Sequence, residues 1–203
     1  MKAYRLDRFE VLNWGTFHKR IWSIEAKCAN ILVTGDNGSG KSTLIDGLAT
    51  LLVRPQRLHY NLAGGASAKE RSKQTYVLGH WKSETAGDQT ASPGRSKPVS
   101  LRGPNQQSVL LAVFRSDEDA VTLAQVFWCS DYISPPHVLF LVAEGALGID
   151  GAFTGNAEVE MRINLHSRIA TRVLRKVGFT RYRKEEHIYR AALDLPWPDW
   201  FAV

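Results

Sequence analysis

The residues from Gly35 to Thr43 have the types and spacing of a phosphate-binding loop. Gly35-Asp36-Asn37-Gly38-Ser39-Gly40-Lys41-Ser42 matches the pattern G-x-x-x-x-G-K-[ST] at every fixed position. Glycines let the backbone wrap closely around a polyphosphate, so that successive N–H groups and the positive end of a following helix face its charge. The pattern therefore predicts binding of a nucleoside triphosphate, with ATP as the expected nucleotide.

Individual side chains of this loop have distinct expected roles. Lys41 is expected to reach the β- and γ-phosphates and stabilise their charge, and the Ser42 hydroxyl to ligate Mg²⁺. Thr43 is placed for the α-phosphate, and Asn37 for the γ-phosphate. The predicted ATP- and Mg²⁺-binding set is Gly35, Asp36, Asn37, Gly38, Ser39, Gly40, Lys41, Ser42 and Thr43.

The partners that a complete hydrolase needs are harder to find. Such an enzyme requires a carboxylate for the metal and a group that positions the attacking water. The acidic cluster Asp117-Glu118-Asp119 is separated from the preceding apolar run by Arg115 and Ser116, so it is predicted to be an exposed turn. No Asn-Lys-x-Asp guanine-recognition sequence occurs either. The chain therefore resembles part of a larger machine.

The elements around the loop have the order that a P-loop requires. Tyr4–Val11 and Lys19–Glu25 are predicted to be strands, and Ile31–Val33 a short buried strand directly before the loop. After Lys41, apolar residues recur on one helical face and end before Pro55; they are Leu44, Ile45, Leu48, Leu51 and Leu52. Strand, glycine-rich loop and helix thus follow one another.

Farther along, the chain alternates between polar and apolar stretches. Residues 60–107 are polar, and their Gly, Ser and Pro content favours a mobile loop insertion at about 84–107. Beyond it we predict an antiparallel hairpin of Val109–Arg115 and Ala120–Trp128, a further strand at Val138–Ala143, and a helix carrying Leu165, Ile169, Val173 and Val177.

Composition bounds the class of protein. The 203 residues carry a net charge of +6, and residues 160–190 hold nine basic and three acidic side chains. This basic tail would either attract nucleic acid or form a solvated surface. Cys28 and Cys129 fit no metal-ligand spacing, and no apolar run is long enough for a bilayer, so we expect reduced thiols and a cytoplasmic location.

Three segments together resemble the N-terminal head segment of SMC-like ATPases. They are Asn13-Trp14-Gly15-Thr16-Phe17, Trp22-Ser23-Ile24, and Leu32 to Asp46. The nearest likeness is to the SMC-like subunit of the Wadjet plasmid-defence system and to Muk-type condensins. The resemblance implies an α/β P-loop NTPase fold with the mixed parallel and antiparallel sheet of an ABC-type head. Residues 1–150 would form its N-terminal half, and 151–203 a basic tail of separate character.

This resemblance also implies partners. In the family, the C-terminal end of a long chain supplies the Walker B motif, the signature motif and the catalytic carboxylate, and two heads sandwich ATP while acting on DNA. Kleisin-type and winged-helix subunits, and in Wadjet a nuclease, complete the assembly. The isolated chain is then expected to bind ATP without efficient turnover. As the biological role of the whole assembly, the resemblance favours plasmid defence over chromosome organisation.

The resemblance singles out further residues. Arg71 is the candidate for an arginine near the nucleotide or DNA, with a solvated surface arginine as the alternative. Gln125 is compared with the Q-loop glutamine that senses Mg²⁺ and γ-phosphate. Trp14, Phe17 and His18 lie where head proteins contact the adenosine end, although core packing is favoured for Phe17.

Two other functions remain compatible with the residues. One is a self-contained P-loop small-molecule kinase, in which residues 60–107 act as a substrate lid. The other is a non-catalytic nucleotide- or DNA-binding fragment, dominated by the basic helix around residues 167–178. ATP turnover by the chain alone would favour the kinase.

Overall fold

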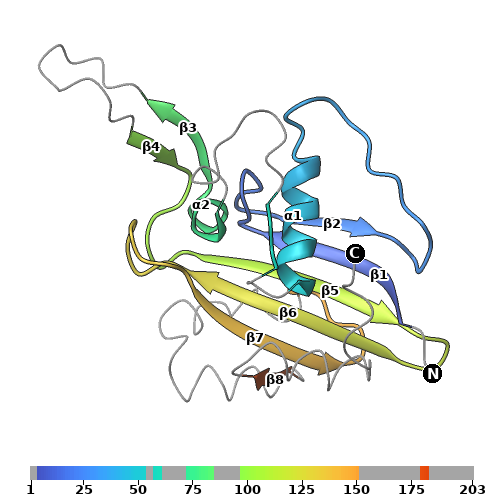
Figure 1. The fold of residues 1–203 in the computed structure, drawn as a ribbon. Coiled ribbons are helices and arrows are strands. Elements are labelled where there is room, and N and C mark those ends of the chain that lie inside the picture. Colours follow the sequence, from blue (N-terminus) through green and yellow to red (C-terminus); the bar gives the residue numbers. More distant parts are fainter. Residues whose placement is uncertain (1–3, 54–56, 61–71, 85–96, 151–178, 183–203) are drawn as a thin grey trace, which may run out of the picture.

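The computed structural model describes residues 4–53, 57–60, 72–84, 97–150 and 179–182. Its main element is a six-stranded sheet in the order β2-β1-β5-β6-β7-β8 (Figure 1). The strands are β1 (Arg5–Leu12), β2 (Ile21–Glu25), β5 (Gln107–Arg115), β6 (Ala120–Trp128), β7 (His137–Glu144) and β8 (Phe179–Tyr182). Every pairing between them is antiparallel.

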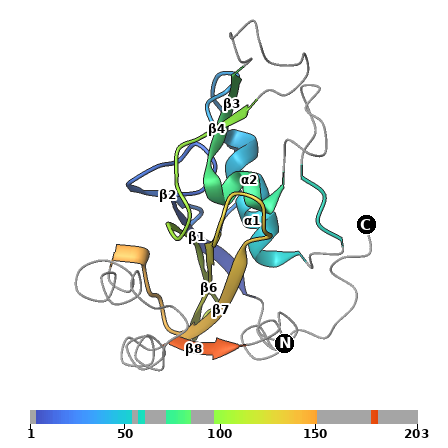
Figure 2. The same cartoon turned by 90° about the vertical axis from the view of Figure 1, so that its left-hand side faces the viewer.

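Two helices and a small hairpin complete the described part of the chain. Helix α1 (Lys41–Leu52) lies against one face of the sheet, and the short helix α2 (Lys73–Leu78) lies beside it. Strands β3 (His80–Glu84) and β4 (Lys97–Ser100) form a hairpin that projects from the body beyond α2 (Figures 1 and 2). Neither α1 nor α2 is long and apolar enough to cross a membrane.

The sheet is apolar on both faces because its central strands alternate between two hydrophobic clusters. On β5, Leu110, Ala112 and Phe114 join the cluster under α1 and α2. Val109, Leu111 and Val113 join the cluster on the opposite face, with Leu139, Leu141 and Ile149. This alternation explains the near-continuous apolar runs of β5 and β6 in the sequence.

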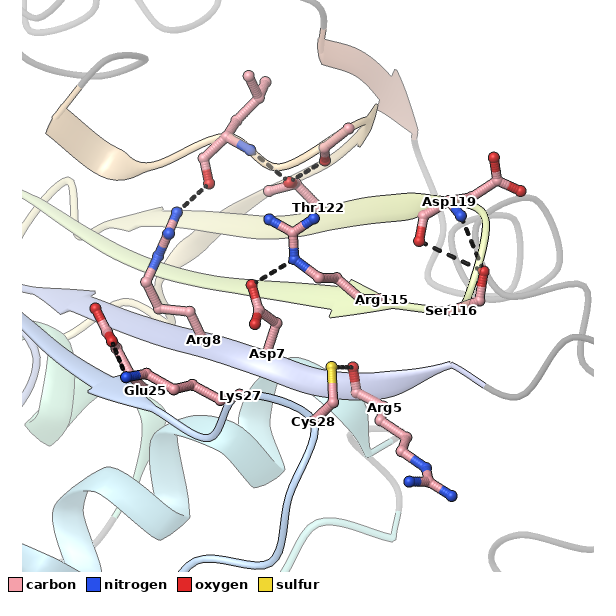
Figure 3. A network of polar contacts seen from close by, with 12 residues as sticks. Arg5, Asp7, Arg8, Glu25, Lys27, Cys28, Arg115, Ser116, Asp119 and Thr122 are labelled. Atoms are coloured by element: carbon pink, nitrogen blue, oxygen red, sulfur yellow. Dashed lines mark hydrogen bonds and ion pairs between the residues drawn. The ribbon is translucent and has the colours of Figure 1, made fainter.

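Polar contacts fasten the segment after β7 to the sheet (Figure 3). Thr122 Oγ1 donates to Gly145 O at 2.7 Å and accepts from Leu147 N at 2.9 Å. Arg8 Nη2 donates to Leu147 O at 3.0 Å, and Ile149 N donates to Glu10 Oε2 at 2.7 Å. The chain after β7 therefore crosses back to β1 on the face opposite α1.

Most predicted elements are confirmed. The two N-terminal strands, the helix after Lys41, the hairpin of β5 and β6, and the strand β7 occur within two residues of the predicted bounds. The predicted helix at 165–177 lies outside the described residues. Residues 179–182, which fall in the predicted tail, form the edge strand β8.

Two predictions are corrected by the structure. The predicted strand at residues 31–33 is wrong, since this segment is neither helix nor strand. Without this strand, the described residues form no parallel pair, and the predicted mixed sheet is not seen among them. The two edges of β1 are already occupied by β2 and β5, so no neighbour is available there. The predicted loop at 84–107 is also wrong in its second half, where β4 forms and Arg102 is buried.

Candidate nucleotide-binding site

The P-loop lies on the surface at the start of α1. Gly40 is the N-cap of α1 and has a left-handed backbone, with φ 94°. A Cβ atom there would also approach Phe17 Cζ to 2.8 Å, so only glycine fits. The first turn of α1 contains no acidic residue, and its N–H groups and dipole therefore present positive charge to an incoming anion.

Lys41 closes the loop onto its own backbone. Its Nζ donates to Gly35 O at 2.6 Å and to Asp36 O at 2.7 Å, and lies 3.5 Å from Ser39 Oγ. An ammonium group held by two carbonyls can exchange them for the stronger charge-assisted bonds of a polyphosphate. The predicted cluster of glycines, Lys41 and Ser39 is therefore brought together by the structure.

The turn between β1 and β2 supports the loop from below. The Phe17 ring packs under Gly40, and Trp14 Nε1 donates to Thr43 O at 3.1 Å. Trp14 is fully buried and stacks on Tyr76, with ring centroids 5.0 Å apart. Trp14 and Phe17 are thus core residues, and the suggestion that Trp14 stacks on adenine does not fit its burial.

His18 follows this turn and is only partly buried. Burial, together with the positive charges of Arg102 and Lys19, lowers the pKa of His18. Arg102 Nη1 lies 3.5 Å from His18 Nδ1. A guanidinium can only donate, so this contact is a hydrogen bond when Nδ1 accepts, as it does in the neutral tautomer with the proton on Nε2. The lowered pKa favours this uncharged form of His18 beside the P-loop support.

A buried polar network ties α1 to α2 behind the loop. The Tyr76 hydroxyl donates to the carboxylate of Asp46, which is almost fully buried on α1. Thr50 Oγ1 lies 3.1 Å from the Tyr60 hydroxyl. Burial raises the pKa of Tyr60 to about 12, so its hydroxyl stays neutral. This network fixes the helix that carries the P-loop against α2.

Arg102 is a large buried polar side chain beneath the turn that carries the P-loop. The sequence alone did not predict this role. Only 2% of the residue is exposed. The guanidinium donates to the carbonyl oxygens of Gly15, Phe17, Tyr76 and Val77. Burial lowers the pKa of Arg102 to about 10, which leaves it charged at neutral pH. A lone arginine in a polar, glycine-rich stretch gives no periodic signal that could have revealed this role.

Two other predicted or considered groups lie away from the loop. Gln125 is buried in β6, and its Nε2 donates to Leu51 O at the far end of α1, so its placement does not match a Q-loop glutamine. Residues 117–119 form the tip of the β5–β6 hairpin, where Ser116 N donates to Asp119 O, in agreement with the predicted turn. Arg71 lies outside the described residues.

Comparisons with known proteins define the class of this region. A family model described as the P-loop containing region of an AAA domain matches residues 6–67. The segment with the loop, β1, β2 and α1 is therefore a P-loop region, which implies nucleotide binding. A comparison with curated proteins gave no match.

One solved structure similar to the chain comes from work described as the structural biochemistry of ATP-driven dimerization and DNA-stimulated activation of SMC ATPases. The sequence identity is 16% and the TM-score 0.41, and the similarity covers 85% of this chain and 98% of that chain.

The residues of the loop fit a metal–nucleotide complex. Ser42 is the second residue of α1, where the pattern places the hydroxyl that ligates Mg²⁺. The described residues contain no cluster of three or more His, Cys, Asp or Glu side chains that could hold a metal without the nucleotide. When bound, Mg²⁺ would neutralise charge on the β- and γ-phosphates. Ser42 and the phosphates, rather than a protein cage, are then its expected ligands.

Proposed function

We propose that this chain is the N-terminal, ATP-binding half of an SMC-like ATPase head, and that a C-terminal head half completes its active site. The observation that carries the proposal is the segment directly before the P-loop. Ile31 and Leu32 are 45% and 88% exposed there, and no described strand pairs with them. A P-loop ordinarily follows a buried strand, so these side chains fit a strand whose neighbours belong to another polypeptide segment.

Other large apolar side chains of the N-terminal part of the chain are also exposed. Ile45 on α1 is 53% exposed, and Trp22 on the edge strand β2 is 38% exposed. The outer edge of β2, which pairs with no described strand, and these side chains would be covered if a second set of strands packed beside the P-loop. In this proposal they belong, together with Ile31 and Leu32, to one contact area for the C-terminal half, which we call the completion surface.

Two groups of carboxylates in the described part of the chain lie away from the phosphate side of the loop. Asp46 is engaged by Tyr76 behind the loop, and the acidic residues 117–119 lie at a hairpin tip. Hydrolysis needs a carboxylate that holds the metal and another group that positions water. In the proposed assembly, the C-terminal half supplies both.

The proposed biological setting follows the motif resemblance. Two completed heads would sandwich ATP and Mg²⁺ and act on DNA, with kleisin-type and winged-helix subunits as partners. Plasmid defence is preferred over chromosome organisation. The open position of the P-loop, whose residues 35–39 are all exposed, supports engagement by a second protein surface.

The test measures ATP binding and turnover by the chain and by its Lys41→Ala variant, each alone and mixed with a C-terminal head segment from the same source. We expect Lys41-dependent ATP binding, with turnover only in the mixture. Turnover by the chain alone would contradict the half-head proposal and favour a self-contained kinase or hydrolase.

A further inference from the structure

The buried guanidinium of Arg102 connects elements that are distant in sequence. Its Nε donates to Val77 O at 2.7 Å, and Nη2 donates to Tyr76 O at 2.7 Å and Gly15 O at 2.8 Å. Its Nη1 donates to Phe17 O at 3.3 Å. None of the ion pairs among the described residues includes Arg102. Backbone carbonyls, two of them at the C-terminal end of α2, thus stabilise this buried charge.

The turn held by Arg102 is the turn on which the P-loop rests. A Cβ atom at Gly15 would lie 2.5 Å from Thr43 Cγ2, so the turn backbone touches the first turn of α1. Two residues later, the Phe17 ring packs under Gly40. Arg102 therefore holds the backbone of Gly15 and Phe17, the two turn residues that contact Thr43 and Gly40. A shift of the turn would change both of these contacts.

Arginine is needed here for geometry as well as for charge. The guanidinium presents five donors in a rigid planar fork, and this arrangement reaches four carbonyls on two elements. A lysine would keep the charge, but its single ammonium carries only three donors on a flexible stem. Arg102→Lys therefore keeps the positive charge and removes the fixed planar set of donors, so its effect reports on the geometry of the guanidinium.

We propose that Arg102 is a positioning residue for nucleotide binding, which acts by holding the Gly15–Phe17 turn under the P-loop. The inference rests on the nucleotide-binding role of the P-loop, but not on the half-head assignment. Arg102 itself does not contact the nucleotide in this proposal. Its effect passes through Phe17 and Gly15 to the loop.

The first experiment measures the ATP affinity of the full chain and of Arg102→Lys, alongside thermal unfolding. Loss of hydrogen bonds from a charged donor is expected to weaken ATP binding by about tenfold or more. The matched control is Val113→Ala, which removes methyl groups from a fully buried residue on the opposite face of the sheet. It should lower stability while leaving the ATP affinity of the folded protein unchanged. An Arg102→Lys variant that loses only stability, as Val113→Ala does, would overturn the proposal.

A double-mutant cycle tests the route through the turn. If Arg102 acts through Phe17, then Arg102→Lys should cost much less affinity in a Phe17→Leu background than in the original chain. Fully additive losses would mean that the effect of Arg102 does not pass through the Phe17 ring, which would contradict the proposed route.

Amide hydrogen exchange measured without nucleotide tests the role of Arg102 separately from the proposed ATP-binding function. Arg102→Lys should accelerate amide exchange in peptides covering residues 13–18 and 35–44, relative to Val113→Ala. Equal exchange in the two variants would refute the positioning role. If the original chain binds no ATP, the proposed function fails, and this exchange measurement still decides the role of Arg102.

Discussion

Leu32 offers the sharpest test of the completion surface. Its side chain is 88% exposed in the segment before the P-loop, so Leu32→Ser removes almost no buried area from the isolated chain. We expect the free energy of unfolding of the chain to change by less than about 0.5 kcal/mol, as for other surface substitutions.

The same substitution should matter when the C-terminal head segment binds. Burying a leucine side chain is worth roughly 1.5–3 kcal/mol. If Leu32 becomes part of a strand between the two halves, its loss should therefore weaken their association by roughly 10- to 150-fold. Isothermal titration of the chain with the C-terminal segment measures this change directly, and the reconstituted ATPase rate provides a second reading.

Ile133 supplies the matched control. It is 89% exposed and lies in the connection between β6 and β7, at the opposite side of Figure 1 from the loop between β2 and α1. Ile133→Ser should leave the association constant unchanged. The proposal is refuted if Leu32→Ser and Ile133→Ser have the same effect on association, or if Leu32→Ser strongly destabilises the isolated chain.

Further predictions concern the support of the site. Tyr76→Phe removes a hydrogen bond to a buried carboxylate of α1 and should lower the free energy of unfolding by about 1–3 kcal/mol, measured by urea denaturation. Burial, and then the nearby guanidinium, lower the pKa values of His18 and His80 below the ordinary value of 6.5. The unfolded chain therefore binds protons more readily, and stability present above pH 6.5 is lost as the pH falls below it. The melting temperature should therefore be lower at pH 5.5 than at pH 7.5. This difference should be smaller in a variant in which both histidines are replaced by Asn. Burial raises the pKa of the Cys129 thiol to about 11. In a Cys28→Ser variant, a thiol reagent at pH 8 should modify Cys129 only after unfolding; rapid modification of the native protein would contradict its burial.

Local patterns were sufficient for several elements of the fold. The P-loop, the helix with its apolar face at Leu44 and Leu48, and the hairpin of β5 and β6 all depend on residues close together in sequence. Their signals are spacing and periodicity, which are visible before any tertiary contact forms. The turn at residues 116–119 was predicted for the same reason.

Other features depend on which segments lie side by side. Residues 31–33 have the composition of a buried strand, yet a strand also needs a partner strand, and no described strand pairs with them. Strand β4 forms in a polar, proline-containing stretch because β3 lies opposite it. Sequence periodicity contains no information on either pairing.

By itself, the sequence determined that this protein has a phosphate-binding loop between an N-terminal sheet and an amphipathic helix. Only the tertiary structure decided what supports that loop. Arg102 is 85 residues from Phe17 and 87 from Gly15, and its hydrogen bonds to them form because folding brings β4, α2 and the turn together. Contacts over such separations depend on the packing of whole elements, so no local spacing of residue types could predict them.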